Sequence, residues 1–139
     1  MNPGPDADRG RALIKIWWLI WAGMIFSLGA IYGAVLFLKL PGRPPHPNPF
    51  VDLVGLVPLF LSIVIRWLVL PRYNDVRRAF PMFVAGLALA DGCGILGVFL
   101  GGPYRDDLFV LGVLGLVQFV PFFAKGFLEP KPQGFIPNN

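Results

Sequence analysis

Four long apolar segments, separated by short polar links, constrain the fold of this chain more than any other feature. The segments comprise residues 16–38, 50–70, 81–100 and 108–127, and each is 20 to 23 residues long. An α-helix rises about 1.5 Å per residue, so about 20 residues cross the hydrocarbon core of a bilayer. None of the segments alternates apolar and polar residues as a membrane β-strand would. The pattern therefore predicts four membrane-spanning helices.

The composition excludes several other classes of protein. Hydrophobic residues make up 55% of the 139 residues and charged residues only 14%, whereas soluble domains carry about 25% charged residues. A soluble chain this short would expose too much surface to hide so many apolar side chains. We therefore expect one all-α integral membrane domain over residues 1–139, with mobile tails at residues 1–10 and 129–139.

The links and their charges predict a topology. Because the links are short, successive spans should be antiparallel neighbours. Nine Lys and Arg residues fall at the end of the bundle that holds both termini, and three fall at the other end. The positive-inside rule then places both termini in the cytoplasm. Four tryptophans fall at the same interface, as an aromatic belt would: Trp17, Trp18, Trp21 and Trp67. The first span is too long for the apolar core of a signal peptide, so we expect it to be retained.

Each predicted span carries one polar residue at a similar depth in the bilayer. They are Ser27, Ser62, Asp91 and Gln118, and helical geometry places them about 10–16 Å from the predicted cytoplasmic ends. If their faces converge, they form a central polar layer. Asp91 is the most informative of the four, because a carboxylate at the midplane costs at least about 2.5–3.5 kcal/mol. We therefore expect Asp91 to face the bundle and to be paired or protonated.

These polar residues also have a purely structural interpretation. A protonated Asp91 could donate one hydrogen bond that locks helix packing, and each serine could bond to the backbone of its own helix. For Gln118 we expect a partner on another helix. Arg66, near the end of the second span, should extend its charged group to the lipid headgroups, and an approach to Asp91 is the alternative.

Small residues predict where helices pack closely. Gly29 and Gly33 are spaced by four residues in the first span, and Gly86, Ala90 and Gly94 have the same spacing in the third. Lipid provides no hydrophobic drive to bring helices together, so close backbone approach is what favours their packing. We expect these residues to pack within the monomer, and contacts between subunits are the alternative.

Chemical motifs are mostly absent from the sequence. His46 stands alone in a proline-rich link, so we expect no metal site. Cys93 lies in an apolar run, where a thiol stays protonated and inert. The basic residues form no continuous patch, so we expect no nucleic-acid partner, and no soluble substrate is evident. We therefore expect a protein that is not an enzyme and that has no catalytic residues and no cofactor.

One stretch of the third span resembles a known family. Residues 86–98 place Asp91 after Ala-Leu-Ala and before Ile and Gly, and this resembles the carboxylate helix of rotary ATP synthase c subunits. The resemblance implies that Asp91 would match the carboxylate that carries a proton or a sodium ion. The rest of the chain departs from that family, because it has four predicted spans instead of a two-helix hairpin. The overall layout resembles small four-span bacterial membrane proteins, which implies a place in the inner membrane and no known activity.

Two functions remain open at this point. The first is a small structural or accessory membrane protein that acts through helix–helix contacts, within a homo-oligomer or with a larger membrane complex. Small-residue stripes and the lack of catalytic groups favour it. The alternative is an oligomeric proton or ion conductor that uses Asp91. A single four-helix bundle is too thin to enclose a path, so conduction would need several subunits around an axis.

Overall fold

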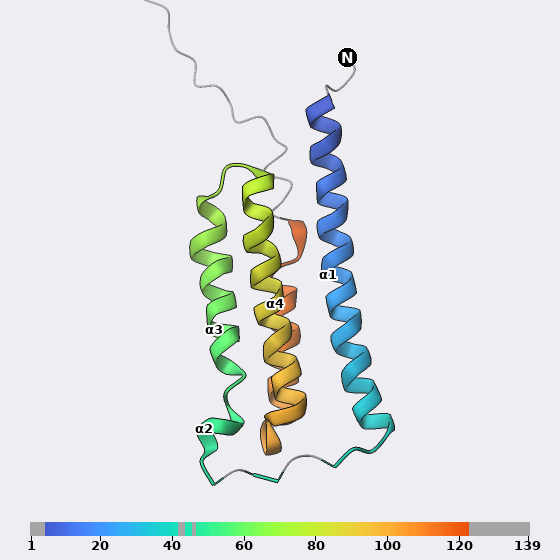
Figure 1. Ribbon diagram of the computed structural model, residues 1–139, viewed down its shortest axis with the longest axis vertical. Helices are drawn as coiled ribbons and strands as arrows, with labels where there is room; N and C mark the ends of the chain where they lie inside the picture. The colour runs from blue at the N-terminus through green and yellow to red at the C-terminus, as the bar shows by residue number, and fades with distance from the viewer. Residues whose placement is uncertain (1–4, 42–43, 46, 123–139) are drawn as a thin grey trace, which may run out of the picture.

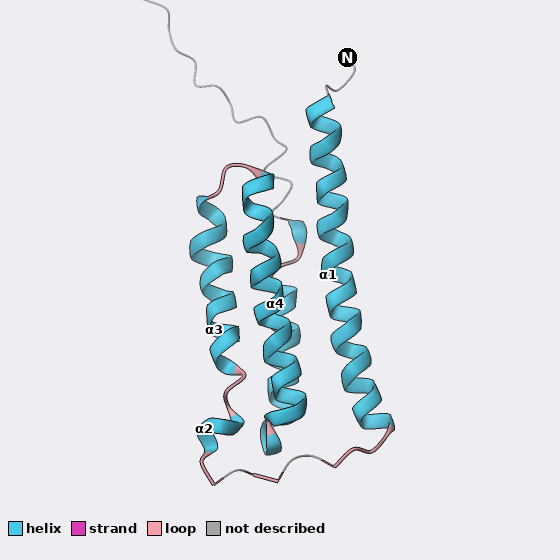
Figure 2. Ribbon diagram, viewed as in Figure 1, coloured by secondary structure: helices cyan, strands magenta, loops and turns pink. Residues whose placement is uncertain are grey.

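The fold is a bundle of α-helices. The computed structural model describes residues 5–41, 44–45 and 47–122, and all regular elements within these residues are helical (Figure 2). This confirms the prediction of an all-α chain for the described part. The α-helices, labelled in Figure 1, are α1 (Pro5–Phe37), α2 (Pro49–Asp52), α3 (Leu56–Val64), α4 (Val76–Leu100) and α5 (Arg105–Val117). A π-helical turn (Ile65–Val69) and a 3-10 turn (Leu70–Arg72) extend α3, and a 3-10 turn (Gly102–Tyr104) precedes α5.

Helix α4 lies at the centre and contacts α1, α3 and α5 (Figure 1). It runs parallel to α1, because Trp17 stacks on Phe83 and Leu28 lies against Gly94. It runs antiparallel to α5, because Leu108 lies against Gly97 near one end and Phe119 against Gly86 near the other. The core is thus built around α4, and α1 contacts α4 along one side only.

Small residues on α4 permit this central position. Gly86, Ala90, Gly94 and Gly97 are all buried. A Cβ atom built on Gly94 would come within 2.7 Å of Leu28 Cδ2, and one built on Gly97 would come within 2.4 Å of Leu108 Cβ. A side chain at position 97 would meet the backbone of Leu108 and displace α5, and one at position 94 would displace the side chain of Leu28. The stripe predicted at residues 86, 90 and 94 therefore packs within the monomer.

The helix boundaries differ from the predicted spans. Helix α1 begins at Pro5, eleven residues before the predicted span, so part of the expected tail 1–10 is helical. The predicted span 50–70 is divided, because α2 ends at Asp52 and α3 begins at Leu56. Gly55 in this break is buried against the main-chain oxygen of Cys93. Helix α4 begins at Val76, since the side chain of Asp75 caps its first turn by accepting a hydrogen bond from Arg77 N.

The predicted fourth span is α-helical only in its first half within the described residues. Helix α5 ends at Val117, and residues 118–119 form a turn. Residues 123–127 of that span, and the predicted tail 129–139, lie outside the described residues.

Two helices are long and apolar enough to cross a membrane. They are Ala12–Phe37 in α1 and Arg77–Leu100 in α4. Helix α3 has 9 residues and continues through its π-helical and 3-10 extensions to Arg72, and α5 has 13 residues. Each of these segments is shorter than the about 20 residues that a straight span requires. The structure thus supports two of the four predicted spans by length and composition.

Candidate functional site

Ser62 and Gln118 are the two predicted polar residues that the structure brings together. Ser62 is buried on α3, and its Oγ donates a hydrogen bond of 2.9 Å to the main-chain oxygen of Gly86 on α4. Gln118 Nε2 in turn lies 3.5 Å from Ser62 Oγ, at the outer limit of a hydrogen bond. Ser62 therefore bonds across helices instead of to its own backbone. These contacts join α3, α4 and the end of α5.

Arg66 extends this cluster in a way that the sequence analysis missed. Its Nε donates a hydrogen bond of 2.7 Å to the main-chain oxygen of Gln118, which is the residue that caps the C-terminus of α5. A cation is favoured there, because the last carbonyl groups of a helix carry partial negative charge. Arg66 also lies in the π-helical turn Ile65–Val69, and such turns occur frequently at functional sites. The contact depends on α5 ending at Val117, which the apolar pattern did not reveal.

Asp91 lies apart from this cluster, on the side of α4 that faces α1. It follows Phe83 by eight residues and precedes Gly94 by three, and both of those residues contact α1. Gly86, which binds Ser62, is about 140° away around the helix at 100° per residue. The Oδ1 atom of Asp91 is buried and has no hydrogen-bond partner among the described residues. Asp91 is thus half-buried with one buried carboxylate oxygen, and it does not join Ser62 and Gln118.

Ser27 does not take part in a polar layer. Its side chain is exposed on α1, because the next residue, Leu28, makes the contact with Gly94. Successive residues on a helix are separated by about 100°, so burying Leu28 turns Ser27 outward. The expected layer of four residues is therefore reduced to the contact between Ser62 and Gln118.

Gly29 and Gly33 do not lie where the sequence predicts. Both are exposed, and a Cβ atom built on either would meet no other atom within 4 Å. The expectation that they pack within the monomer is wrong for the described part of the chain, since α1 meets α4 through Trp17 and Leu28 instead. Contacts with another chain stay a prediction for these two glycines.

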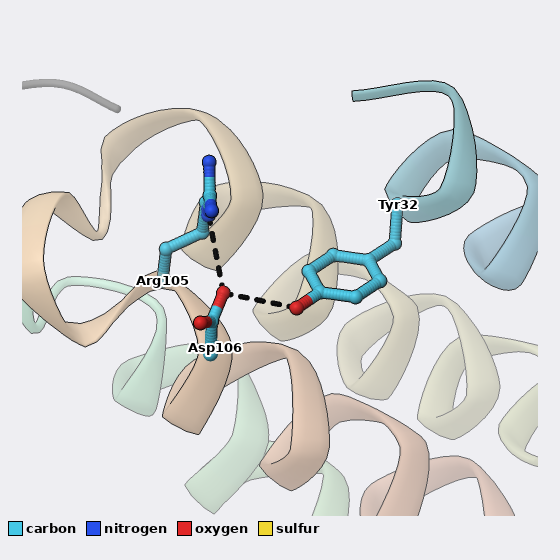
Figure 3. A network of polar contacts seen from close by, with 3 residues as sticks. All are labelled: Tyr32, Arg105 and Asp106. Atoms are coloured by element: carbon cyan, nitrogen blue, oxygen red, sulfur yellow. Dashed lines mark hydrogen bonds and ion pairs between the residues drawn. The ribbon is translucent and has the colours of Figure 1, made fainter. Parts of the chain in front are cut away.

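A second polar network joins α1 and α5 at the opposite end of the bundle. Figure 3 shows Tyr32 and Arg105 converging on the carboxylate of Asp106. Tyr32 Oη donates a hydrogen bond of 3.0 Å to Asp106 Oδ1, and Arg105 Nε donates one of 3.1 Å to the same atom. The Tyr32 ring stacks on Phe109, with the ring centroids 3.9 Å apart. The hydrogen bonds from Arg105 and Tyr32 lower the pKa of Asp106.

Sequence reasoning gave Asp106 no partner on α1. The available signal was that Tyr32 and Asp106 both lie near the end of the bundle opposite the termini. Depth alone could not show that the two residues face each other.

These contacts hold helices together, and the buried Oδ1 atom of Asp91 takes part in none of them among the described residues. Among the described residues, no three His, Cys, Asp or Glu side chains are grouped so that they could hold a metal ion. The chain matches no protein-family model, and no curated protein or solved structure is similar to it.

Proposed function

We propose that this chain is a small multi-pass membrane protein of structural or accessory type, which acts through helix–helix contacts in the bilayer. The two helices that could cross a membrane, Ala12–Phe37 and Arg77–Leu100, support a membrane location. The four apolar segments and the distribution of basic residues support the finer proposal. In that proposal four antiparallel spans lie in a bacterial inner membrane, with both termini in the cytoplasm.

The single observation that carries this function is the outward face of α1. Phe26, Gly29, Gly33 and Phe37 follow one another at intervals of three or four residues, so they lie on one side of the helix. The two glycines meet no other atom within 4 Å of a built Cβ. The phenylalanines on either side of them are 78% and 87% exposed. We call these four residues the α1 stripe.

The α1 stripe has a shape that suits another helix better than lipid. Two glycines between two large rings form a gap in which a second backbone can come close, and such small residues are enriched where membrane helices meet. No other helix of the described chain packs into this gap. Glycine costs a helix about 1 kcal/mol relative to alanine, so lipid contact alone gives no reason for two glycines there.

The test is the assembly state of the protein after purification in mild detergent, measured by native mass spectrometry. We expect a homo-oligomer or a complex of fixed stoichiometry, and we expect the double variant Gly29→Leu/Gly33→Leu to lose it. The control is Gly92→Leu on α4, because a Cβ at Gly92 also meets nothing within 4 Å. A wild-type protein that is strictly monomeric and retains no partner would contradict the proposal.

Asp91 supports a second candidate function, that of an oligomeric proton or ion conductor. Its Oδ1 atom is buried without a partner, within the candidate span Arg77–Leu100. Ionisable residues inside membranes frequently mark ion or proton pathways. The test is proton flux into liposomes that contain a pH-sensitive dye. Asp91→Asn should abolish the flux, and the control Asp107→Asn, at the exposed start of α5, should leave it unchanged. Equal flux through the wild type and Asp91→Asn would eliminate this function.

A further inference from the structure

Three exposed arginines gather where α3 and its extension turn into α4. They are Arg72, Arg77 and Arg78, and we call them the link arginines. The ion pair found among the described residues, Arg105 with Asp106, involves none of them. The carboxylate within the link, that of Asp75, accepts a hydrogen bond from the main-chain nitrogen of Arg77 as the cap of α4. This link therefore carries an excess of positive charge that the described residues leave uncompensated.

Two of the link arginines, Arg77 and Arg78, are not placed to stabilise α4. Arg77 and Arg78 lie in the first turn of α4, which contains no acidic residue. The first turn of a helix carries partial positive charge, so acidic residues are favoured there and basic residues are not. The dipole of α4 therefore gives no reason for the two positive charges at this position.

An exposed apolar surface begins directly beside this charge. Trp67 is 64% exposed and Leu68 is 57% exposed, and both lie within five residues of Arg72. The guanidinium of Arg66 lies 5.5 Å from the centre of the Trp67 ring, a cation–π geometry. Tryptophan is enriched at the boundary between lipid headgroups and acyl chains. The surface thus changes from basic to apolar over one turn and a half of helix.

We propose that the link arginines bind the phosphate of an anionic phospholipid whose acyl chains lie along the neighbouring apolar surface. Guanidinium groups match phosphate oxygens in charge and geometry. A ligand with an anionic head and an apolar tail fits both parts of this surface, whereas a nucleic acid would leave Trp67 and Leu68 exposed. The inference rests on the proposed membrane location, and it adds a preference for one class of lipid.

The test uses the full chain in nanodiscs that contain equal amounts of phosphatidylglycerol and phosphatidylcholine. The lipids that stay bound after transfer to detergent are counted by native mass spectrometry. We expect the wild type to retain phosphatidylglycerol in preference. Each basic residue near the surface contributes roughly fivefold in affinity. Arg77→Gln/Arg78→Gln should therefore lower that preference about 30-fold.

Three further variants make the result specific. Arg77→Lys/Arg78→Lys keeps the charge but loses the planar guanidinium groups, so its preference should lie between those of the wild type and the double glutamine variant. Lys39→Gln/Arg43→Gln removes the same charge from the opposite link and should have no effect. Arg72→Gln, which changes a residue outside α4, should lower the preference roughly fivefold. This variant tests the lipid site even if the double glutamine variant does not fold.

Two outcomes separate this inference from the function on which it rests. A chain that enters the nanodiscs but retains both lipids equally, or that loses as much preference through Lys39→Gln/Arg43→Gln, overturns the lipid site alone. A chain that does not enter the nanodiscs overturns the proposed membrane function together with this inference.

Discussion

Gly94 of α4 and Gly112 of α5 lie so close that a Cβ atom on Gly112 would come within 2.6 Å of the Cα atom of Gly94. Leu28 of α1 packs against the same Gly94, so three helices meet at one residue that has no side chain. This meeting point fixes which side of α1 is buried. It thereby leaves Gly29 and Gly33 open on the other side.

Gly112→Ala should destabilise the fold, because the added methyl group would meet backbone atoms that cannot move aside. We expect a loss of about 1–3 kcal/mol, even though alanine favours helices more than glycine does. Unfolding in detergent, followed by tryptophan fluorescence, measures it. The matched control is Gly92→Ala, whose methyl group meets nothing within 4 Å. If the two variants are equally stable, α4 and α5 are not in direct contact at Gly112.

Arg66→Gln should loosen the end of α5, because it removes the cation from the C-terminal carbonyl groups of that helix. Hydrogen bonds to charged groups contribute about 1.5–3 kcal/mol, so amide exchange over residues 114–118 should become faster. Hydrogen–deuterium exchange with mass spectrometry measures this. Arg72→Gln serves as the control, since Arg72 is exposed. Unchanged exchange in Arg66→Gln would show that the hydrogen bond to Gln118 does not hold α5.

The Tyr32–Asp106 hydrogen bond should make stability depend on pH. The pKa of Asp106 is lowered in the folded state, chiefly by the hydrogen bonds from Arg105 and Tyr32. A lowered folded pKa contributes stability above the unfolded pKa of about 3.9, and this stability is lost as the pH falls through the lower folded value. Wild type should therefore be more stable than Tyr32→Phe at pH 7, and the difference should shrink below about pH 4.

Thermal unfolding of the two proteins between pH 3 and pH 7 measures this difference. Tyr32→Phe keeps the ring that stacks on Phe109, so it removes the hydroxyl group alone. Asp107→Asn is the control on α5, and it should not change the pH profile. A difference between wild type and Tyr32→Phe that is the same at every pH would show that Asp106 is not the partner.

Asp91→Leu should stabilise the isolated chain, because a buried carboxylate oxygen without a partner is replaced by an apolar group. An unsatisfied buried polar group costs about 1–3 kcal/mol, and the variant should recover part of this in detergent unfolding. In the proposed ion conductor, Asp91 is needed for conduction, so a stabilising substitution there would be a usual trade-off between stability and activity. If Asp91→Leu instead destabilises the chain, the carboxylate has a stabilising partner within the fold.

The sequence predicted the helical class and the heights of the polar residues, but not their directions. Helical rise places Ser27, Ser62, Asp91 and Gln118 at similar depth whatever the packing. Which side of each helix is buried depends on a few contacts between distant residues. Leu28 on Gly94 turns Ser27 outward, and the bond from Ser62 to Gly86 draws α3 to a side of α4 away from Asp91.

The helix ends were harder to predict than the helices. Hydropathy continues through residues 53–55 and beyond Val117, although α-helix does not. The break before α3 follows from the close approach of Gly55 to the backbone of α4, and the end of α5 is where Arg66 binds the Gln118 carbonyl. Both are tertiary contacts, which an apolar pattern along the chain does not encode.

The most direct test of the central claim, that the α1 stripe contacts another protein helix, is photo-crosslinking in native membranes. A photoreactive phenylalanine analogue in place of Phe26 keeps the ring beside Gly29, and the same analogue in place of Phe60 probes α3, where the ring is 66% exposed. We expect a discrete protein adduct from position 26 and none from position 60. Adducts with lipid alone from position 26, or the same protein adducts from both positions, would contradict it.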